Sequence, residues 1–302
     1  MENDLHVQAE PMAETYFAIT VSHDGEALGV PKFLQKAEAR ELGPGALEFT
    51  IDVAEIEPKS FTKKLIEDLG DGFDVCVMPA IAREKSLLIC DMDSTVIGQE
   101  CIDELADFAD LKDRVSAITE RAMRGELDFE EALTERVALL KGLSEDKLER
   151  CFEEKITLNP GIRTLTATMT KRGATCLLVS GGFTFFTSRV AAEAGFSENY
   201  ANTLLFNGAE LSGEVGRPIL GRQAKLDRLN EAVERLGLNV KDVLAMGDGA
   251  NDLAMIEAAG LGVGFHPHPV LAEAANAVIR GPSLAAALYF QGIPKADWVE
   301  ID

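Results

Sequence analysis

Three short apolar runs constrain the fold of this chain more than any other feature. They are SLLIC (86–90), ATCLLVS (174–180) and DVLAMGD (242–248). Runs without polar alternation predict strands that are buried on both faces, as in a parallel sheet. Helix-patterned segments lie between and around them, at roughly 161–172, 184–195 and 222–237. Strands that alternate with helices need right-handed crossovers, so we predict a doubly wound parallel α/β fold. LGVGF (261–265) and NAVI (276–279) predict two further short strands.

Two segments depart from this alternation. Residues 99–155 are rich in Glu, Leu, Ala and Arg with helical patterning, which predicts a small helical cap inserted after the first strand of the sheet. Before the sheet, strands are predicted at 15–22, 47–54 and 73–80, and helices over KFLQKAEAREL (32–42) and KSFTKKLIEDL (59–69). We therefore predict a small N-terminal α/β domain (1–80), a catalytic core (83–98 and 157–302) and a cap (99–156).

Acidic residues follow two of the apolar runs. Asp91 and Asp93 lie in DMDST directly after 86–90, and GDGAND (247–252) ends the run at 242–248. Ligands of open α/β sheets bind beyond the carboxyl ends of the strands. Taken alone, DMDST is also compatible with a helix cap or a turn. Four acids from two strand ends, however, predict an oxygen-rich site suited to Mg²⁺.

Two weaker features follow other strand ends. Ser180-Gly181-Gly182 ends the run at 174–180 and offers a hydroxyl and a backbone N–H to phosphate oxygens, although such a turn is often structural. Lys225 opens a helix after a glycine-containing loop, and by itself it is compatible with an ordinary surface lysine.

Taken in order, these motifs resemble those of the haloacid dehalogenase superfamily. The family pattern is DxDxT, then Ser-Gly, then Lys, then GDGxND, and the resemblance covers roughly residues 83–290. It implies Mg²⁺-dependent phosphoryl transfer through a covalent aspartyl-phosphate on Asp91. With an acidic residue at position 93, the chain resembles the phosphatases of the family. The ion-pumping ATPases of the family have a non-acidic residue at this place.

The resemblance also implies a role for each motif residue. Asp91 would be the nucleophile, and Asp93 would be the general acid and base. Mg²⁺ would be held by Asp91, Asp248 and the backbone carbonyl of Asp93, with Asp252 orienting Lys225 or metal waters from the second layer. The phosphate oxygens would be bound by Ser180, Gly181, Lys225 and Asn251.

The segment DMDSTVIGQECIDELA (91–106) and the cap resemble the members of the family that act on the phosphate ester of serine. The implied reaction is hydrolysis of O-phospho-L-serine to L-serine and phosphate, the last step of serine biosynthesis. Glu100 would bind the substrate ammonium and Arg136 its carboxylate, and Met123 and Phe129 would form an apolar lid. Without the resemblance, these four residues are compatible with solvated helix charges and ordinary core side chains.

Two other functions stay open at this point. A phosphotransferase of the same family would pass the phosphoryl group from phosphoserine to another alcohol such as homoserine, with nearly identical motifs. The N-terminal unit weakly resembles the ligand-binding regulatory domains of other family members, so an amino-acid-sensing regulatory protein is the second alternative. No motif in residues 13–80 supports it.

Charge and cysteine content bear on partners and compartment. The net charge is −22, from 29 basic and 51 acidic residues, which disfavours nucleic acids and anionic membranes as partners. Five cysteines without a CxxC pair predict buried free thiols, and no leader or membrane-span pattern is found, so we expect a cytoplasmic protein. The HPHP stretch with His266 and His268 predicts a loop rather than a zinc site. A homodimer stays open.

Overall fold

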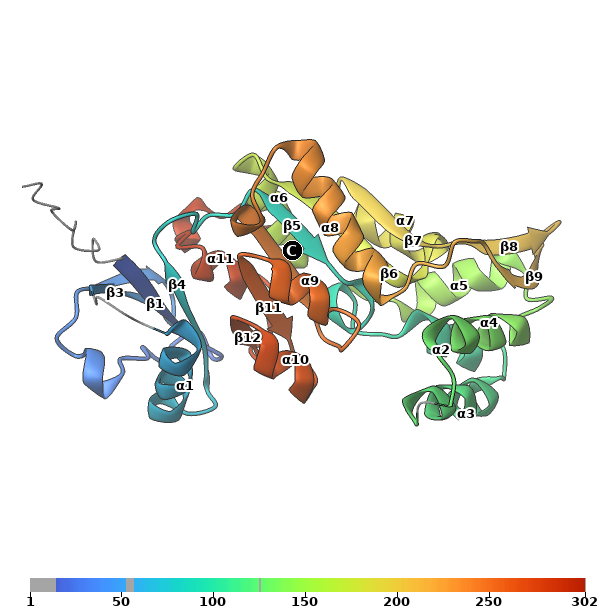
Figure 1. Ribbon diagram of the computed structural model, residues 1–302, viewed down its shortest axis with the longest axis horizontal. Coiled ribbons are helices and arrows are strands. Elements are labelled where there is room, and N and C mark those ends of the chain that lie inside the picture. The colour runs from blue at the N-terminus through green and yellow to red at the C-terminus, as the bar shows by residue number, and fades with distance from the viewer. Residues whose placement is uncertain (1–14, 53–56, 125, 302) are drawn as a thin grey trace, which may run out of the picture.

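A mostly parallel sheet forms the centre of the protein (Figure 1). The computed structural model describes residues 15–52, 57–124 and 126–301 of the chain, apart from the side chains of residues 52 and 123. In these residues, the sheet order is β2-β3-β1-β4-β12-β11-β10-β5-β6-β7. The last six are parallel to one another: β12 (Ala277–Ile279), β11 (Leu261–Phe265), β10 (Val243–Gly247), β5 (Leu87–Cys90), β6 (Thr175–Phe183) and β7 (Glu198–Asn202). The five strands predicted for this part are confirmed, and β7 is an addition.

The strand order reverses beside β5. The chain runs outward from β5 to β6 and β7, and then returns to place β10 on the other side of β5. Such a reversal separates the loops that leave neighbouring strands and creates a crevice at their carboxyl ends. The predicted doubly wound α/β fold is confirmed, and its switch point lies where DMDST and GDGAND leave the sheet.

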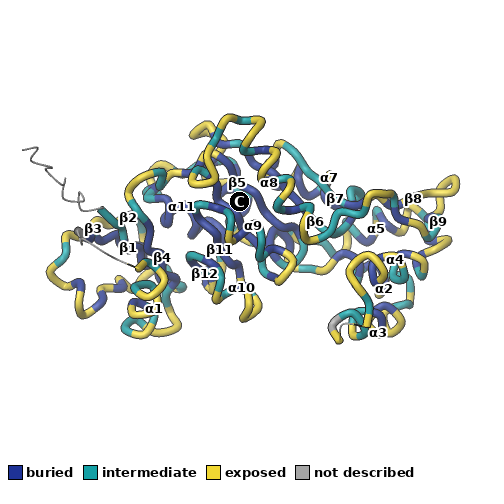
Figure 2. The backbone as a smooth tube through the Cα atoms, viewed as in Figure 1, coloured by how far each residue is buried: buried dark blue, intermediate teal, exposed yellow. Residues whose placement is uncertain are grey.

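Both faces of β5 are buried, as its apolar run predicts. Leu88 and Cys90 pack in one hydrophobic cluster, and Leu87 and Ile89 pack in another on the opposite face. Helices α6 (Ile162–Lys171), α7 (Thr184–Ala194) and α11 (Ala286–Phe290) supply the first cluster. Helices α8 (Arg222–Leu236), α9 (Leu253–Ala258) and α10 (Pro269–Ala274) supply the second. Figure 2 shows the central strands as the most buried part of the chain.

Four helices follow the first strand of the core. They are α2 (Cys101–Phe108), α3 (Lys112–Met123), α4 (Phe129–Leu139) and α5 (Glu145–Lys155), and they lie at one end of the molecule (Figure 1). A hairpin of β8 (Leu204–Asn207) and β9 (Glu210–Val215), which the sequence did not predict, packs beside them. Its Leu211 exchanges backbone hydrogen bonds with Gly142 and Leu143 in the loop after α4, so the hairpin supports the helices.

The N-terminal unit continues the central sheet at its other end. It contains β1 (Thr15–Ser22), β2 (Ala39–Gly43), β3 (Ala46–Asp52), β4 (Phe73–Pro79) and helix α1 (Pro58–Leu69). Strand β4 pairs antiparallel with β12, at Val75 and Val278. The helix predicted over 32–42 is wrong, because this segment forms one 3₁₀ turn and the edge strand β2. The division into three domains stays a prediction.

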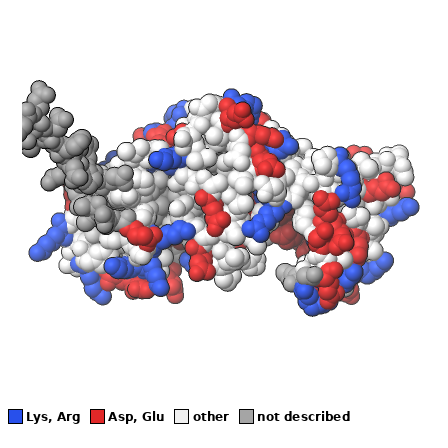
Figure 3. Space-filling model, viewed as in Figure 1, with Lys and Arg blue, Asp and Glu red and all other residues white. Residues whose placement is uncertain are grey.

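The remaining general predictions concern thiols, charge and membrane spans. All five cysteines are buried and free, as predicted. On the face in Figure 3, acidic and basic side chains lie interspersed. Within the described ranges, no helix combines the length and the apolar character that crossing a membrane requires.

Candidate active site

A cleft of about 650 Å³ lies where β5, β6 and β10 end, facing α2, α3 and α4. Most of the predicted site residues line it: Asp91, Asp93, Glu100, Phe129, Arg136, Ser180, Gly181, Asp248 and Asn251. Lys225 and Asp252 lie behind this lining, and both are buried. The side chain of Met123 lies outside the described part of the structure.

Several lining residues were not predicted. They are Ser94, Ile102, Asp103, Thr119, Leu133, Gly182, Phe183, Gly249, Ala250, His268 and Val270. Ser94, Gly182, Gly249 and Ala250 belong to the motifs already described, and two of the others had a usable signal. Asp103 lies three residues after Glu100, which is the spacing of neighbours on one helix face. His268 follows β11, whose carboxyl end lies at the same sheet edge as those of β5 and β10.

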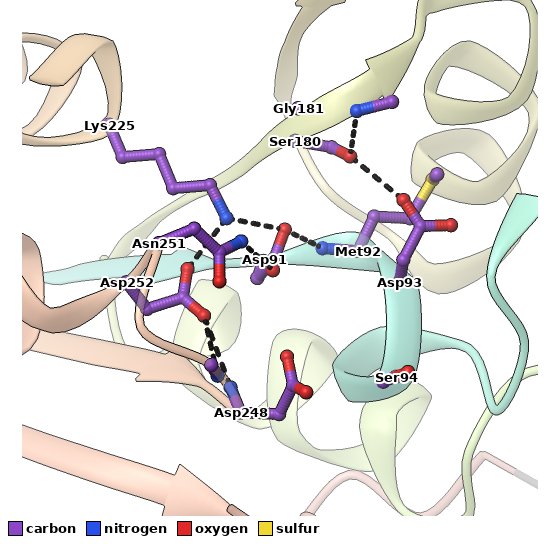
Figure 4. A network of polar contacts seen from close by, with 12 residues as sticks. Asp91, Met92, Asp93, Ser94, Ser180, Gly181, Lys225, Asp248, Asn251 and Asp252 are labelled. Atoms are coloured by element: carbon purple, nitrogen blue, oxygen red, sulfur yellow. Dashed lines mark hydrogen bonds and ion pairs between the residues drawn. The ribbon is translucent and has the colours of Figure 1, made fainter. Parts of the chain in front are cut away.

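Asp91 and Lys225 form a buried ion pair at the base of the cleft (Figure 4). The Lys225 ammonium lies 2.7 Å from Asp91 Oδ1 and 2.6 Å from Asp252 Oδ1. Asp91 Oδ1 also accepts the Met92 N–H at 2.8 Å, and its Oδ2 accepts the Asn251 amide at 3.3 Å. Burial, together with the charge of Asp252, raises the pKa of Asp91 well above its usual range. Although burial acts to lower it, the two carboxylates raise the pKa of Lys225, so it is a cation at neutral pH.

Acidic side chains from both motifs meet beside this pair. One carboxylate oxygen from each of Asp91, Asp248 and Asp252 lies within 4.8 Å of the others. Asp252 is already engaged, because its Oδ2 accepts the N–H groups of Asp248 and Gly249 at 3.2 and 3.1 Å. Burial, with the charge of Asp252, raises the pKa of Asp248 to about 6. An all-oxygen set of carboxylates, in which the charge of Asp252 raises the pKa of Asp91 and of Asp248, is suited to a hard divalent cation such as Mg²⁺.

Asp93 points toward Ser180 (Figure 4). Its Oδ2 accepts the Ser180 hydroxyl at 3.1 Å, and its Oδ1 accepts the Cys101 N–H at 2.9 Å. Burial raises the pKa of Asp93, and these hydrogen bonds oppose the rise. A Cβ atom on Gly182 would lie 2.9 Å from Asp93 Oδ2, so glycine is needed for this close approach. Asp93 is therefore a partly buried carboxyl that can hold a proton beside the Asp91 carboxylate.

The helices contribute charged and aromatic groups to the other wall of the cleft. Glu100 is exposed at the cleft and accepts the Ser94 hydroxyl at 2.7 Å; partial desolvation by the surrounding cleft, with the charge of Asp93, raises the pKa of Glu100 to about 7. Arg136 is held through Nε by the Ala132 carbonyl at 3.3 Å, which leaves the other nitrogens of the guanidinium for a ligand. Phe129 lies against the backbone of the Ser180-Gly181 turn, since a Cβ on Gly181 would come within 3.2 Å of its ring.

Chemically, the cleft combines the parts of a group-transfer site. It holds a carboxylate that could serve as a nucleophile, a second carboxyl that can carry a proton, and an acidic cluster that could hold a divalent cation. On the opposite wall, Glu100 and Arg136 offer one negative and one positive group.

Known proteins with similar sequences and folds agree with this description. Residues 88–257 match the haloacid dehalogenase-like hydrolases. The phosphoserine phosphatase of Archaeoglobus fulgidus is 39% identical over 242 residues, which make up 79% of this chain and 70% of that protein. A HAD-family hydrolase of Salmonella enterica serovar Typhi has a TM-score of 0.81 at 26% identity, covering 91% of this chain and 98% of its own. A phospho-aspartyl intermediate analogue of phosphoserine phosphatase has a TM-score of 0.63 at 35% identity, covering 68% of this chain and 99% of its own.

Proposed function

Because the chain belongs to the haloacid dehalogenase-like hydrolases, we propose that it is a phosphatase that hydrolyses O-phospho-L-serine to L-serine and phosphate. One observation carries the proposal: a single cleft contains the Asp91–Asp93 pair on one wall and Glu100 with Arg136 on the other. Phosphoserine has a phosphate, an ammonium and a carboxylate, and the cleft offers a chemical partner for each.

In the first half of the reaction, a carboxylate oxygen of Asp91 attacks phosphorus. The bond from Asp91 to phosphorus forms while the bond from phosphorus to the serine oxygen breaks. Asp93 gives its proton to the departing serine oxygen. The raised pKa of Asp93 supports this role, since the proton must be present before it can be transferred; the pKa of Asp91 is also raised, but there the charge of Lys225 opposes the rise and favours the ionised nucleophile.

In the second half, water hydrolyses the aspartyl-phosphate. Asp93 is now ionised and takes a proton from the attacking water. The water oxygen bonds to phosphorus, the bond to Asp91 breaks, and free phosphate leaves. Asp91 and Asp93 thereby return to their starting protonation states, so the two carboxyls complete a cycle without another reagent.

Asp91 and Asp248 are the residues we propose as magnesium ligands, with the backbone carbonyl of Asp93. Asp252 belongs to the same cluster, but its two oxygens already bind Lys225 and two backbone N–H groups, which supports an orienting role. Bound Mg²⁺ supplies positive charge that lets an anionic nucleophile approach an anionic phosphate. Because the chain has a net charge of −22, it would repel an anionic substrate without such a local positive charge.

Lys225, Ser180, Gly181 and Asn251 are proposed to stabilise charge on the transferring phosphoryl group. Lys225 pairs with Asp91 at the base of the cleft, so its positive charge acts on the Asp91 carboxylate and on the bond that forms between Asp91 and phosphorus. Asn251 lies in the cleft, with its amide 3.3 Å from Asp91 Oδ2.

A screen of phosphomonoesters, with and without Mg²⁺, tests the proposed function. Phosphoserine is expected to give the highest kcat/KM, and chelation is expected to abolish turnover until Mg²⁺ is restored. Preference for an ester without an amino acid part, or full turnover in a chelator, would refute the proposal. Adding homoserine to the same assay and looking for phosphohomoserine separates a hydrolase from a phosphotransferase.

Replacing Arg136 with alanine is expected to weaken binding only of substrates that carry a carboxylate. A charge-assisted bond of this kind contributes about 1.5–3 kcal/mol, so the KM for phosphoserine should rise roughly 10- to 100-fold. O-phosphoethanolamine lacks the carboxylate and serves as the matched substrate. Its KM should change less than about threefold; equal increases for both substrates would remove Arg136 from the substrate site.

Selectivity for the substrate ammonium is expected to depend on pH through Glu100. Because the pKa of Glu100 is raised to about 7, this carboxyl is protonated below that pH and ionised above it. Only the ionised form attracts an ammonium, so the preference for phosphoserine over 3-phosphoglycerate should fall as pH drops from about 8 to about 6. The comparison cancels titration of the phosphate, which both substrates carry. Glu100→Gln should abolish the trend, and a preference independent of pH in the wild type would contradict this role.

A further inference from the structure

A bulge in β6 leaves the Ser180-Gly181-Gly182 turn without regular strand pairing. The register between β6 and β7 is regular up to Val179, shifts across the turn, and resumes where Phe183 pairs with Asn202. Backbone groups in a bulge lose their ladder partners and need others. The Gly181 carbonyl finds its partner in a side chain, since Asn202 Nδ2 donates to it at 2.9 Å.

The same side chain binds a second loop. Asn202 Nδ2 also donates to the Leu220 carbonyl at 3.1 Å, and Asn202 Oδ1 accepts the Leu220 N–H at 2.6 Å. Leu220 precedes the helix α8, whose first turn carries Lys225. Asn202 is only 2% exposed and does not line the cleft. It thus joins the bulge in β6 to the start of the helix that bears the buried lysine.

A directed chain of hydrogen bonds leads from Asn202 to Asp93. The Gly181 carbonyl and the Gly182 N–H belong to one peptide group, and this N–H donates to Ser180 Oγ at 2.8 Å. A serine hydroxyl has a single proton, and with its oxygen already accepting, Ser180 donates that proton to Asp93 Oδ2 at 3.1 Å. Holding the peptide on its carbonyl side therefore fixes the direction in which the hydroxyl points, and such chains polarise along their length.

We infer that Asn202 is a positioning residue for catalysis, which acts through the Gly181–Gly182 peptide to orient the Ser180 hydroxyl toward Asp93. The inference rests on the proposed roles of Ser180 and Asp93. Asn202 does not line the cleft, and it belongs to none of the sequence motifs that predicted the site. Its effect on turnover should therefore depend on whether the Ser180 hydroxyl is present.

A double-mutant cycle between Asn202 and Ser180 tests this dependence. Asn202→Leu keeps a similar volume but has no polar atoms, and Ser180→Ala removes the hydroxyl. Each single variant is expected to lose about 10- to 100-fold in kcat for phosphoserine, as misplaced catalytic groups do. The kcat of the double variant should lie within about threefold of the kcat of the less active single variant, because both changes break the same chain of hydrogen bonds.

A neighbouring asparagine provides the matched control. Asn199 also lies on β7, where it pairs with Leu178 before the bulge. Its side chain accepts hydrogen bonds from Thr187 at 2.8 Å and Ser188 at 3.4 Å on α7. Asn199→Leu should keep kcat within about twofold of the wild type. Unfolding midpoints of all variants separate lost stability from lost turnover, and Asn202→Ala replaces Asn202→Leu if that variant does not fold.

The outcomes are distinguishable from failure of the proposed function. Losses that multiply in the double variant, or wild-type kcat in a folded Asn202 variant, would overturn the inference. Failure of both Asn202 variants to fold would also overturn it, by making the residue structural. If the wild type did not prefer phosphoserine, the proposed substrate would be wrong. The double-mutant cycle would still test Asn202, with the phosphomonoester that the wild type hydrolyses fastest as substrate.

Discussion

Replacing Asp91 with asparagine is expected to lower phosphoserine turnover by roughly ten-thousand-fold or more, because an amide does not accept a phosphoryl group. The fold should persist. The pKa of Asp91 is raised by burial and by Asp252, so a neutral amide avoids the cost of burying a charge at this position, and Lys225 keeps Asp252 as its partner. The unfolding midpoint without divalent cation should therefore stay the same or rise.

A buried aspartate outside the cleft serves as a control for the general effect of replacing a buried aspartate with asparagine. Asp74 is 2% exposed and accepts the N–H groups of Arg280 and Gly281 near the junction of β4 with the core. Asp74→Asn should lose stability but keep kcat. Substantial turnover in Asp91→Asn, measured alongside this control, would refute Asp91 as the nucleophile.

Replacing Lys225 with methionine is expected to damage stability and activity together. The side chain is 1% exposed and lies between two carboxylates, so its removal leaves Asp91 and Asp252 buried without a counter-charge. Breaking a buried pair in this way costs about 3–5 kcal/mol. Because the pKa of Lys225 is raised, its contribution is fully present at neutral pH and is lost only in strong alkali. Turnover should fall by about a hundredfold or more, since the nucleophile loses its positioning and the phosphoryl group a positive charge.

Two further variants separate these effects. Adding Asp252→Asn to Lys225→Met removes one unpaired carboxylate, so it should restore part of the lost stability but none of the activity. Lys85 is the matched control: it is 5% exposed, and its ammonium binds the carbonyls of Ala82 and Lys241 at 2.6 and 2.7 Å, before β5 begins. Lys85→Met should lose stability while kcat stays unchanged. A stable, active Lys225→Met would contradict the account.

Much of the fold could be predicted because the core strands are buried on both faces. In a globular protein, short continuous apolar runs such as 86–90 usually form buried strands. The polar residues at the carboxyl ends of these runs then predict where the cleft lies. Strand β2 could not be predicted in this way. Its ARELG segment consists largely of good helix formers and is mostly exposed at a sheet edge, so only its pairing with β3 makes it a strand.

Other residues of the site were missed because their positions depend on tertiary proximity rather than on motifs. Thr119 and Leu133 reach the cleft because α3 and α4 fold back over the strand ends. Asn202 meets Gly181 only because β6 bulges beside β7. Neither feature leaves a pattern in the local sequence, since each depends on how separate elements pack.

The covalent bond to Asp91 is the central claim, and chemical trapping tests it most directly. Wild-type protein is mixed with Mg²⁺ and phosphoserine, quenched within one turnover and reduced with borohydride, which converts an aspartyl-phosphate into homoserine. Peptide mass spectrometry should then find homoserine at position 91, and neither the Asp91→Asn variant nor protein without substrate should give it. Rapid hydrolysis of phosphoserine with position 91 unchanged, or with the modification on another carboxyl, would contradict the account.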